Sequence, residues 1–512
     1  MDNFRSSSPA WVPYTGLSKH FAMPAVGHTS GCDRRLGRRP DRLQAAPQSK
    51  TLSVPSTVFS SLPLSAAMLA NLDALGYTAM TPIQAQSLPV MLKGQDLIAQ
   101  AKTGSGKTAA FGIALLEPLN PRYFGCQALV LCPTRELADQ VAKELRRLAR
   151  AADNIKILTL CGGVSIGPQI ASLEHGAHVI VGTPGRVQEH LKKGTLKLDG
   201  LNTLVLDEAD RMLDMGFYDA IAEIIGHTPA KRQTLLFSAT YPSGIKQLSA
   251  SFMRDPQQVR AEALHDDTQI EQRFYEIDPE QRMEAVVRLL ASFRPESCVA
   301  FCFTKQQCQE LVDHLSAKGI SAMALNGDLE QRDRDQVLAM FANRSLSVLV
   351  ATDVAARGLD IDALDMVINV ELARDSEIHV HRVGRTGRAG NQGLAVSLVA
   401  PAEAHRAQAI EKLQKAPLNW HPLDSLKAQA GEPLQPPMVT LCIGAGRKDK
   451  LRPGDILGAL TGDAGIPGTQ VGKIAIFDFQ AFVAVERGVA KQALKRMNEG
   501  KIKGRSLKVR LL

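Results

Sequence analysis

The sequence predicts two tandem α/β domains, each with a doubly wound parallel sheet, followed by a small α+β domain. Three observations lead to this fold class. Two series of short apolar runs alternate with helical stretches, which is typical of strands buried on both faces of a parallel sheet. A proline-rich linker at residues 426–437 precedes a β-α-β-β-α-β pattern. The 512 residues suffice for about three domains.

The first α/β domain is expected over residues 57–260 and the second over residues 268–425, with a polar connector around residues 261–272. The expected strands of the first domain are residues 96–101, 127–132, 155–161, 178–182, 202–207 and 233–238. Those of the second domain are residues 298–303, 320–325, 347–353, 366–370 and 393–399. In the third domain, residues 438–512, helices are expected from about Pro453 and from about Val489.

The net charge of +8 is distributed unevenly along the chain. Residues 1–50 carry +5 and residues 438–512 carry +8, which leaves −5 for the residues between them. We expect residues 1–50 to form a disordered basic leader, with an organelle transit peptide as an alternative. The basic C-terminal segment favours a polyanion partner, although a merely solvated basic surface would explain it too.

Composition also excludes several classes of protein. With 45% hydrophobic and 22% charged residues, the chain is neither wholly disordered nor collagen-like. No apolar run approaches the roughly 18 residues of a membrane-spanning helix, so we expect no membrane partner. The 8 cysteines form no CxxC pair, and most lie in apolar runs. This pattern predicts buried free thiols in a cytoplasmic protein and makes a zinc site improbable.

The segment after residues 96–101 has the pattern of a phosphate-binding loop that opens a helix, with Ala101 in place of the first glycine. Backbone N–H groups and the helix N-terminus are suited to wrap a phosphate. Lys107 would reach the β- and γ-phosphates of ATP, and Thr108 would ligate Mg²⁺. The expected ATP-binding residues here are Ala101, Lys102, Thr103, Gly104, Ser105, Gly106, Lys107 and Thr108.

Charged groups elsewhere complete the expected chemistry of ATP hydrolysis. The apolar run at residues 202–207 ends in two adjacent carboxylates, Asp207 and Glu208. Asp207 would hold Mg²⁺, and Glu208 would orient or deprotonate the attacking water. In the second domain, Arg385 and Arg388 belong to an arginine-rich segment that could stabilise charge on the transferred phosphate. A basic surface loop is the alternative for these arginines.

Over about residues 57–420, this motif set resembles the DEAD-box RNA helicases of superfamily 2, in the order of the family's motifs. The resemblance implies two RecA-like domains. It assigns Gln84 to the adenine edge, with Thr81 in support and Phe59 stacked on the base. It also places Asp353 and Asp360 in an ATP network between the two domains.

The same resemblance implies RNA contacts by residues that follow strands. In the first domain these residues are Pro133, Thr134, Arg135, Gly163, Thr183, Pro184 and Arg186; in the second they are Thr304, Arg334, Thr352 and Gly358. Ser238 and Thr240 resemble the motif that couples hydrolysis to strand separation. Arginine side chains, threonine hydroxyls and backbone N–H groups suit phosphate contacts, which carry no sequence information. Each such segment alone could instead be a helix cap.

The third domain resembles an RNA recognition motif with few aromatic residues. Gln480 and Phe482 occupy the usual stacking positions of its third strand, and Thr440 stands where the first strand usually has an aromatic residue. We therefore expect its sheet to read single strands weakly. Clustered basic residues suit the phosphates of a structured RNA, with a protein-docking domain as the alternative.

The three-domain combination resembles a bacterial branch of the family, which implies a role in assembling the large (50S) ribosomal subunit. Its implied target is structured 23S rRNA within the pre-50S particle. The sequence thus predicts an ATP-dependent RNA helicase, an RNA-dependent ATPase with ATP and Mg²⁺ as cofactors. An ATP-dependent clamp that remodels ribonucleoprotein without unwinding and a non-catalytic RNA-binding scaffold remain open, and a DNA translocase is a further alternative.

Overall fold

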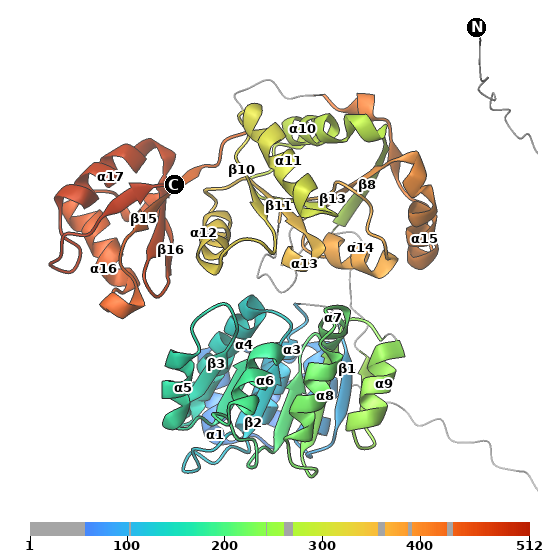
Figure 1. Cartoon of the computed structure of the whole chain (residues 1–512), viewed down its shortest axis with the longest axis vertical. Coiled ribbons are helices and arrows are strands. Elements are labelled where there is room, and N and C mark those ends of the chain that lie inside the picture. The colour runs from blue at the N-terminus through green and yellow to red at the C-terminus, as the bar shows by residue number, and fades with distance from the viewer. Residues whose placement is uncertain are drawn as a thin grey trace, which may run out of the picture. The chain divides into compact units, whose positions relative to one another are not determined.

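The computed structural model describes residues 57–101, 104–241, 243–260, 270–356, 364–387, 392–427 and 434–512 (Figure 1). The leader expected at residues 1–50, most of the connector and half of the linker lie outside these ranges. Two parallel sheets and one antiparallel sheet follow one another along the chain, which confirms the predicted fold class. Within the described ranges, no helix is both long and apolar enough to cross a membrane.

The first α/β domain contains a seven-stranded parallel sheet in the order β3-β4-β2-β5-β6-β1-β7. Its strands are β1 (Leu97–Gln100), β2 (Ala128–Leu131), β3 (Ile157–Leu160), β4 (Val179–Gly182), β5 (Thr203–Leu206), β6 (Gln233–Ser238) and β7 (Gln257–Arg260). Its helices are α1 (Ala66–Ala74), α2 (Pro82–Met91), α3 (Lys107–Leu116), α4 (Arg135–Leu148), α5 (Gly167–Glu174), α6 (Pro184–Lys192), α7 (Ala209–Asp214), α8 (Tyr218–Gly226) and α9 (Ser243–Phe252).

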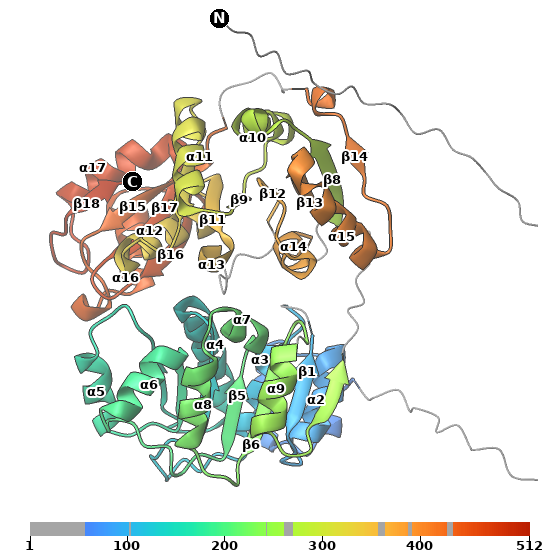
Figure 2. The ribbon, with the colours of Figure 1, turned by 45° about the vertical axis from the view of Figure 1, so that its right-hand side comes forward.

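Helices cover both faces of this sheet, which explains why its strands are continuous apolar runs. Successive side chains of a strand point to opposite faces. In β2, Ala128 and Val130 therefore join a core with α1, α2, α3 and α4, whereas Leu129 and Leu131 join a second core with α6, α8 and α9. Figure 2 shows α8 and α9 on one face of the sheet.

The second α/β domain repeats this design in the strand order β10-β11-β9-β12-β13-β8-β14. Its strands are β8 (Ile270–Glu276), β9 (Cys298–Cys302), β10 (Ala322–Leu325), β11 (Val348–Thr352), β12 (Met366–Asn369), β13 (Gly393–Val399) and β14 (Trp420–His421). Its helices are α10 (Arg282–Phe293), α11 (Lys305–Ala317), α12 (Gln331–Ala342), α13 (Asp353–Ala356), α14 (Ser376–Val383) and α15 (Ala404–Gln414).

The strands that the sequence analysis missed lie at or near the edges of the two sheets. β7, at one edge, reads Gln-Gln-Val-Arg and is largely exposed, so it has no apolar run to detect. The polar connector was expected to extend to residue 272, but β8 already begins at Ile270. β8 reads Ile-Glu-Gln-Arg-Phe-Tyr-Glu, and only Phe274 and Tyr275 are fully buried, so it has no continuous apolar run. β14 has only two residues.

The C-terminal domain, called the tail below, has the predicted β-α-β-β-α-β order and a four-stranded antiparallel sheet in the order β16-β17-β15-β18. Its strands are β15 (Met438–Ile443), β16 (Val471–Ile476), β17 (Ala481–Glu486) and β18 (Val509–Leu511), and its helices are α16 (Pro453–Gly458) and α17 (Ala490–Glu499). Both helices pack on one face of the sheet, over Leu441, Ile443 and Val483.

The predicted state of the cysteines is confirmed for the described part of the chain. Cysteines 126, 132, 161, 298, 302, 308 and 442 are free and buried there. Burial raises the pKa of Cys126 to about 12, so its thiol stays protonated and packs as a small apolar group. Cys32 lies outside the described residues.

Candidate functional site

The phosphate-binding loop joins β1 to the N-terminus of α3. Gly104 and Gly106 have φ angles of 82° and 91°, in the left-handed region that favours glycine. A Cβ atom on Gly106 would lie only 2.7 Å from Nε2 of Gln84, so this position also excludes side chains sterically. Lys102 and Thr103 lie outside the described residues. The remaining residues place the backbone of a phosphate cradle at the start of α3.

The residues expected around adenine hold the phosphate loop in place. Thr81 Oγ1 donates to the carbonyl oxygen of Ser105 over 2.8 Å, and Gln84 Nε2 donates to that of Gly106 over 3.1 Å. Gln84 Oε1 also accepts from the backbone N–H of Thr81 over 2.8 Å. Phe59 is buried, and its ring meets that of Tyr77 edge-on. Thr81 and Gln84 therefore connect the start of α2 to the phosphate loop.

Lys107, the first residue of α3, and Asp207, which follows β5, are both buried. Lys107 Nζ donates to the carbonyl oxygen of Ala101 over 2.9 Å. Asp207 Oδ1 is buried and has no hydrogen-bond partner within the described part of the chain. Burial raises the pKa of Asp207 to about 7, Lys107 opposes that rise, and Glu208 adds to it. A buried carboxylate oxygen without a partner is suited to a cation brought in by the substrate.

No group of three or more His, Cys, Asp or Glu residues that could hold a metal occurs within the described ranges. Mg²⁺ usually takes one or two protein ligands and completes its shell with substrate phosphates and water. Thr108, in the first turn of α3, and Asp207 are the two side chains expected to contribute.

Glu208 has an unusual backbone conformation and a partner that the sequence analysis missed. Its φ of 53° and ψ of 51° put it in the left-handed region directly before α7. Its buried carboxylate pairs with Arg211 Nη1 at 2.9 Å. Arg211 Nη2 lies 3.3 Å from His381 Nδ1, in the second domain. Arg211 therefore connects the expected hydrolytic carboxylate to the arginine-rich segment; it lies one residue beyond the matched motif.

The expected coupling residues bond to the last residue of the same carboxylate motif. Asp210 Oδ2 accepts from the backbone N–H and the hydroxyl of Thr240, each over 3.0 Å. Ser238 Oγ donates to the Thr240 carbonyl oxygen over 2.6 Å. Burial raises the pKa of Asp210, but the Thr240 hydrogen bonds and neighbouring His381 outweigh it, and the net shift is downward. The structure thus brings the loop after β6 to the carboxylates after β5.

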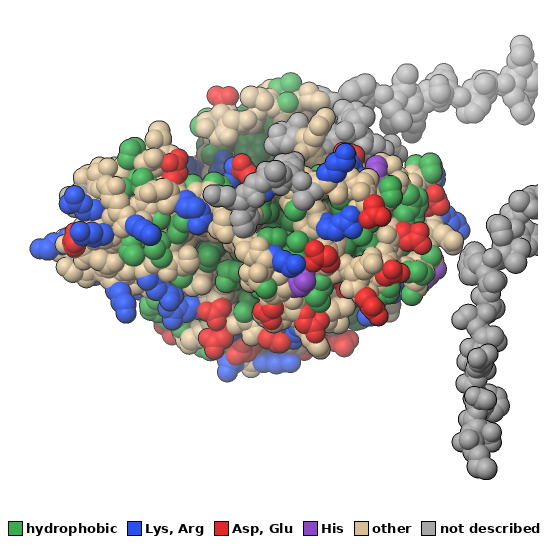
Figure 3. All heavy atoms as spheres, turned by 90° about the horizontal axis from the view of Figure 1, so that it is seen from above, with side chains coloured by type: hydrophobic (Ala, Val, Ile, Leu, Met, Phe, Trp, Pro, Cys, Tyr) green, Lys and Arg blue, Asp and Glu red, His purple; other side chains and the backbone are tan. Residues whose placement is uncertain are grey.

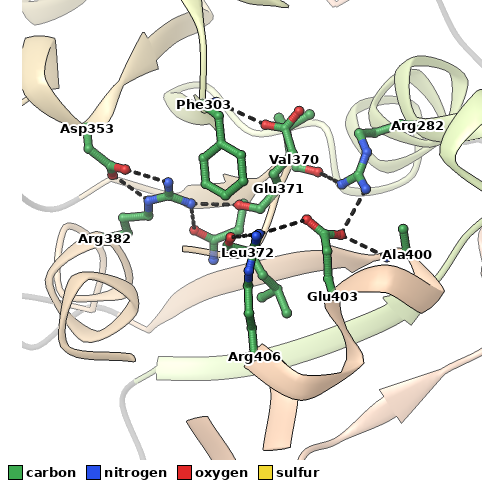
Figure 4. Close-up of polar contacts among 11 residues, drawn as sticks. Arg282, Phe303, Asp353, Val370, Glu371, Leu372, Arg382, Ala400, Glu403 and Arg406 are labelled. Carbon is green, nitrogen blue, oxygen red and sulfur yellow. Dashed lines mark hydrogen bonds and ion pairs between the residues drawn. The ribbon is translucent and has the colours of Figure 1, made fainter. Parts of the chain in front are cut away.

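A buried arginine organises the site residues of the second domain (Figure 4). Arg382 binds both carboxylate oxygens of Asp353, at 2.6 and 2.7 Å. Its Nη1 also donates to Asn369 Oδ1 and to the Glu371 carbonyl oxygen. Asp353 is therefore fixed by an arginine of α14 that belongs to the arginine-rich segment and here pairs with a carboxylate. Asp360, Gly358 and Arg388 lie outside the described residues.

A cavity of about 360 Å³ brings several expected residues together. It is lined by residues from both α/β domains, among them Asp210, Arg211, Thr240, Asp353, His381 and Arg385. Burial, and after it the nearby charge of Arg211, lower the pKa of His381 to about 4. His381 is consequently neutral near pH 7, so the positive charge of the cavity lining comes from its arginines, which lie beside several carboxylates.

In the first domain, the residues expected to contact RNA follow β2, β3 and β4. Arg135 lies over Gly163, where a Cβ atom would come within 2.4 Å of Arg135 Nη1. Nε and Nη1 of Arg135 are buried without partners in the described part of the chain, which suits an incoming phosphate. Thr134 and Pro133 precede α4, and the Thr134 hydroxyl accepts from the Leu137 N–H. Thr134 is thus a helix cap as well.

The segment after β4 contains Thr183, whose hydroxyl does not cap the following helix. Thr183 precedes α6 without a side-chain capping bond, and Pro184 is the first residue of that helix. Arg186 is committed within the domain: it donates to Gln169 Oε1 and to the Val164 carbonyl oxygen. Thr183 is therefore the more available of these phosphate-contact candidates, while Arg186 shapes the loop.

In the second domain, the corresponding residues are held by local bonds. Thr304 caps α11 through the Gln307 N–H, and Thr352 at the end of β11 accepts from the Ala355 N–H. Arg334 donates to the Ala355 carbonyl oxygen over 2.7 Å and pairs with Glu136 of α4. Glu136 and Arg334 thus link segments of the two α/β domains that are expected to contact RNA.

In this structure α12 of the second domain covers the sheet face of the tail that was expected to read single-stranded RNA weakly. Phe482 and Cys442 are buried against Ala339. The Thr440 hydroxyl bonds to Asn343 Nδ2 at 2.8 Å and to the Ser345 hydroxyl at 2.6 Å. Polar groups at this contact are thus paired, and the missing aromatic residues reflect protein packing.

Arg332 of α12 extends this contact by donating to Gln480 Oε1 over 3.1 Å. Figure 3 shows Lys and Arg side chains spread over the tail at the left. They belong to the loop after β15 and to α17 with the segment that follows it: Arg447, Lys448, Lys450, Arg452, Lys491, Lys495, Arg496, Lys501 and Lys503.

Three family models match consecutive parts of the chain. Residues 81–248 match the DEAD/DEAH box helicase model, residues 281–390 the helicase conserved C-terminal domain, and residues 440–511 the DbpA RNA binding domain. The chain is 56% identical to the ATP-dependent RNA helicase DbpA of Escherichia coli over 459 residues, 89% of this chain and 100% of that protein. It is 38% identical to DbpA of Bacillus subtilis, over 88% of this chain and 98% of that protein.

A solved structure resembles the two α/β domains. Yeast (S. cerevisiae) Dbp5 bound to RNA and ADP BeF3 superposes with a TM-score of 0.66 and 29% identity, covering 72% of this chain and 97% of that one. The remainder of this chain lies outside the match.

Proposed function

Because the chain belongs to the DbpA group of DEAD-box ATP-dependent RNA helicases, we propose that it opens short duplexes of 23S rRNA during assembly of the 50S subunit. The observation that carries the rRNA target is the tail. It matches the DbpA RNA binding domain, its sheet face is occupied by α12, and its basic residues belong to the loop after β15 and to α17 with the segment that follows it. We place this activity in the cytoplasm.

ATP hydrolysis is assigned to residues that the fold gathers at one edge of the first sheet. Lys107 leaves the Ala101 carbonyl to bind the β- and γ-phosphates. Thr108 and Asp207 would hold Mg²⁺, which supplies charge neutralisation on the phosphates. Glu208, held by Arg211, orients and deprotonates the attacking water. Arg385 and Arg388 stabilise the γ-phosphate charge from the second domain.

Binding of RNA rests on groups that contact the backbone rather than the bases. Arg135, Thr183 and Thr304 follow parallel strands, at the sheet edge where ligands of α/β proteins bind. Contacts of this kind are unselective for sequence, so the core alone would act on many duplexes. Tethering by the tail raises the effective concentration of one target without any new core contact.

A clamp that remodels ribonucleoprotein without unwinding uses the same ATP site, so strand displacement separates it from a helicase. A non-catalytic scaffold would have no use for Glu208 in a strained conformation or for a buried Asp207 without a partner. These two features favour an active hydrolase.

The proposal is tested by trapping the full-length protein on RNA. Glu208→Gln should bind ATP and RNA but hydrolyse slowly, so crosslinking in ATP should concentrate in one region of 23S rRNA. Glu280→Gln, at an exposed position, is the matched control and should hydrolyse normally. Crosslinks scattered evenly over ribosomal RNA would contradict the proposed target, and near-normal hydrolysis by Glu208→Gln would remove this residue from its role.

A further inference from the structure

Phe479 is the most exposed large hydrophobic side chain in the described part of the chain, at 75% exposure. It lies in the turn between β16 and β17 of the tail. Neither the core of the tail nor the contact with α12 uses its ring. An isolated exposed apolar residue needs no explanation by itself, so the case depends on what surrounds this one.

The turn that carries Phe479 is fastened at several points. The Phe477 N–H donates to the Gln480 carbonyl oxygen over 2.9 Å, and the Phe477 ring meets Phe482 edge-on. The backbone N–H of Arg447 donates to the Phe477 carbonyl oxygen over 2.8 Å. Because this turn is already ordered, it would lose little conformational entropy when a ligand binds to the Phe479 ring.

Gly446 keeps the neighbouring loop close to this turn. A Cβ atom there would lie 2.2 Å from the Phe477 carbonyl oxygen, so only glycine allows the approach. The approach brings Arg447 and Lys448 directly beside the turn: the Lys448 N–H donates to the Asp478 carbonyl oxygen over 3.0 Å. Arg447 Nε donates to the Ile476 carbonyl oxygen over 3.1 Å, and its charge also reaches Asp139 of α4. Asp478 only partly offsets the positive charge, since Arg447 Nη1 is 3.9 Å away and both side chains are more than half exposed.

An exposed aromatic ring beside exposed cations is the combination that binds an unpaired nucleotide. The ring stacks on the base while arginine and lysine hold the flanking phosphates. On an ordinary RNA recognition motif the sheet supplies the rings, but here Phe482 of the sheet is fully buried against α12. Phe479 is the aromatic side chain of the tail left open to solvent among the described residues.

We propose that Phe479 is a base-stacking residue for an unpaired nucleotide of the RNA that the tail binds, with Arg447 and Lys448 on the adjoining phosphates. This inference rests on the proposed function and names a contact within it. It concerns recognition by the tail, so Phe479 has no part in ATP binding or in the RNA contacts of the two α/β domains.

The test uses the full-length protein and a 23S rRNA fragment that stimulates its ATPase more than poly(A) does. Phe479→Ala should raise the concentration of this fragment needed for half-maximal ATPase by about 5- to 150-fold, as expected for one lost stack. The maximal rate and the response to poly(A) should not change. Phe479→Trp keeps an aromatic ring and should bind the fragment about as tightly as the wild type. The fragment should also quench the fluorescence of the added tryptophan.

Two controls separate stacking from other effects. Leu457→Ala removes an exposed apolar side chain elsewhere on the tail, in α16, and should leave fragment affinity unchanged. Phe479→Leu keeps an apolar side chain without a ring and should bind as weakly as Phe479→Ala. Wild-type affinity in Phe479→Ala or in Phe479→Leu would overturn this inference alone. If no 23S rRNA fragment outperforms poly(A) with the wild type, the proposed function fails and this inference fails with it.

Discussion

Asp207→Asn should stabilise the nucleotide-free protein above neutral pH although it removes a residue of the ATP site. In the folded protein, Oδ1 of Asp207 is buried without a partner, and burial raises its pKa from 3.8 to about 7. In the unfolded chain the same carboxyl ionises near its ordinary pKa. Ionisation therefore favours unfolding as the pH rises from about 4 to about 7, and the stability cost is complete above that range.

The size of this cost follows from the pKa difference. A rise from 3.8 to about 7 is roughly three units, and each unit corresponds to 1.36 kcal/mol, so the upper limit is about 4 kcal/mol. Asparagine keeps the shape but never ionises. The buried amide of asparagine still lacks a hydrogen-bond partner, so we expect Asp207→Asn to recover only part of this free energy of unfolding. For a domain of this size, that part corresponds to a Tm increase of several degrees.

Thermal unfolding at a series of pH values measures the effect. The Tm difference between Asp207→Asn and the wild type should be small near pH 4, grow up to about pH 7 and stay constant above it. Asp199→Asn, at an exposed position of the same domain, should show no such trend. Addition of Mg²⁺ and ATP should stabilise the wild type much more than Asp207→Asn. An Asp207→Asn protein that is less stable than the wild type to the same extent at every pH would refute the reasoning.

Three further substitutions test contacts of the site. Arg211→Met should lower the maximal ATPase rate by about tenfold or more with little change in ATP affinity, because the buried partner that positions Glu208 is lost; an unchanged rate would exclude that role. Gly163→Ala should displace Arg135 and raise the RNA concentration needed for half-maximal ATPase several-fold. Gly162→Ala, with open space around its Cβ, should not change that concentration. Equal effects of the two substitutions would argue against a clash with Arg135 as the cause. Asn343→Ala leaves buried polar groups unpaired where α12 and its following loop meet the tail, at a cost of about 1–3 kcal/mol. Amide hydrogen exchange in β15 should therefore accelerate. Unchanged exchange would show that this contact does not hold the tail.

Much of the fold could be predicted from the sequence because burial on both faces of a parallel sheet leaves a direct trace in the chain. β2 and β4 are buried throughout and appear as apolar runs. β7 has no such trace, since it lies at an edge and is largely exposed. The phosphate loop and the paired carboxylates were likewise recognisable, because their chemistry requires particular residues at short spacing.

Contacts that join distant segments left no comparable signal. Arg211 is one residue past the carboxylate motif, and its pairing with Glu208 depends on the left-handed backbone at Glu208. The tail shows the same limit. Thr440 was interpreted as a lost stacking position, but its hydroxyl bonds to Asn343 and Ser345 in another domain. One sequence cannot distinguish a weak RNA-binding face from a face that packs against protein, because both are poor in exposed aromatic residues.

The central claim is that the tail directs an otherwise unselective ATP-driven core to structured 23S rRNA. The most direct measurement is the ATPase rate of the full-length protein against increasing concentrations of 23S rRNA and of an unrelated RNA of equal length. The account predicts half-maximal stimulation at a concentration of 23S rRNA at least about tenfold lower, a difference of about 1.4 kcal/mol in binding. Equal stimulation by both RNAs at equal concentrations would contradict it.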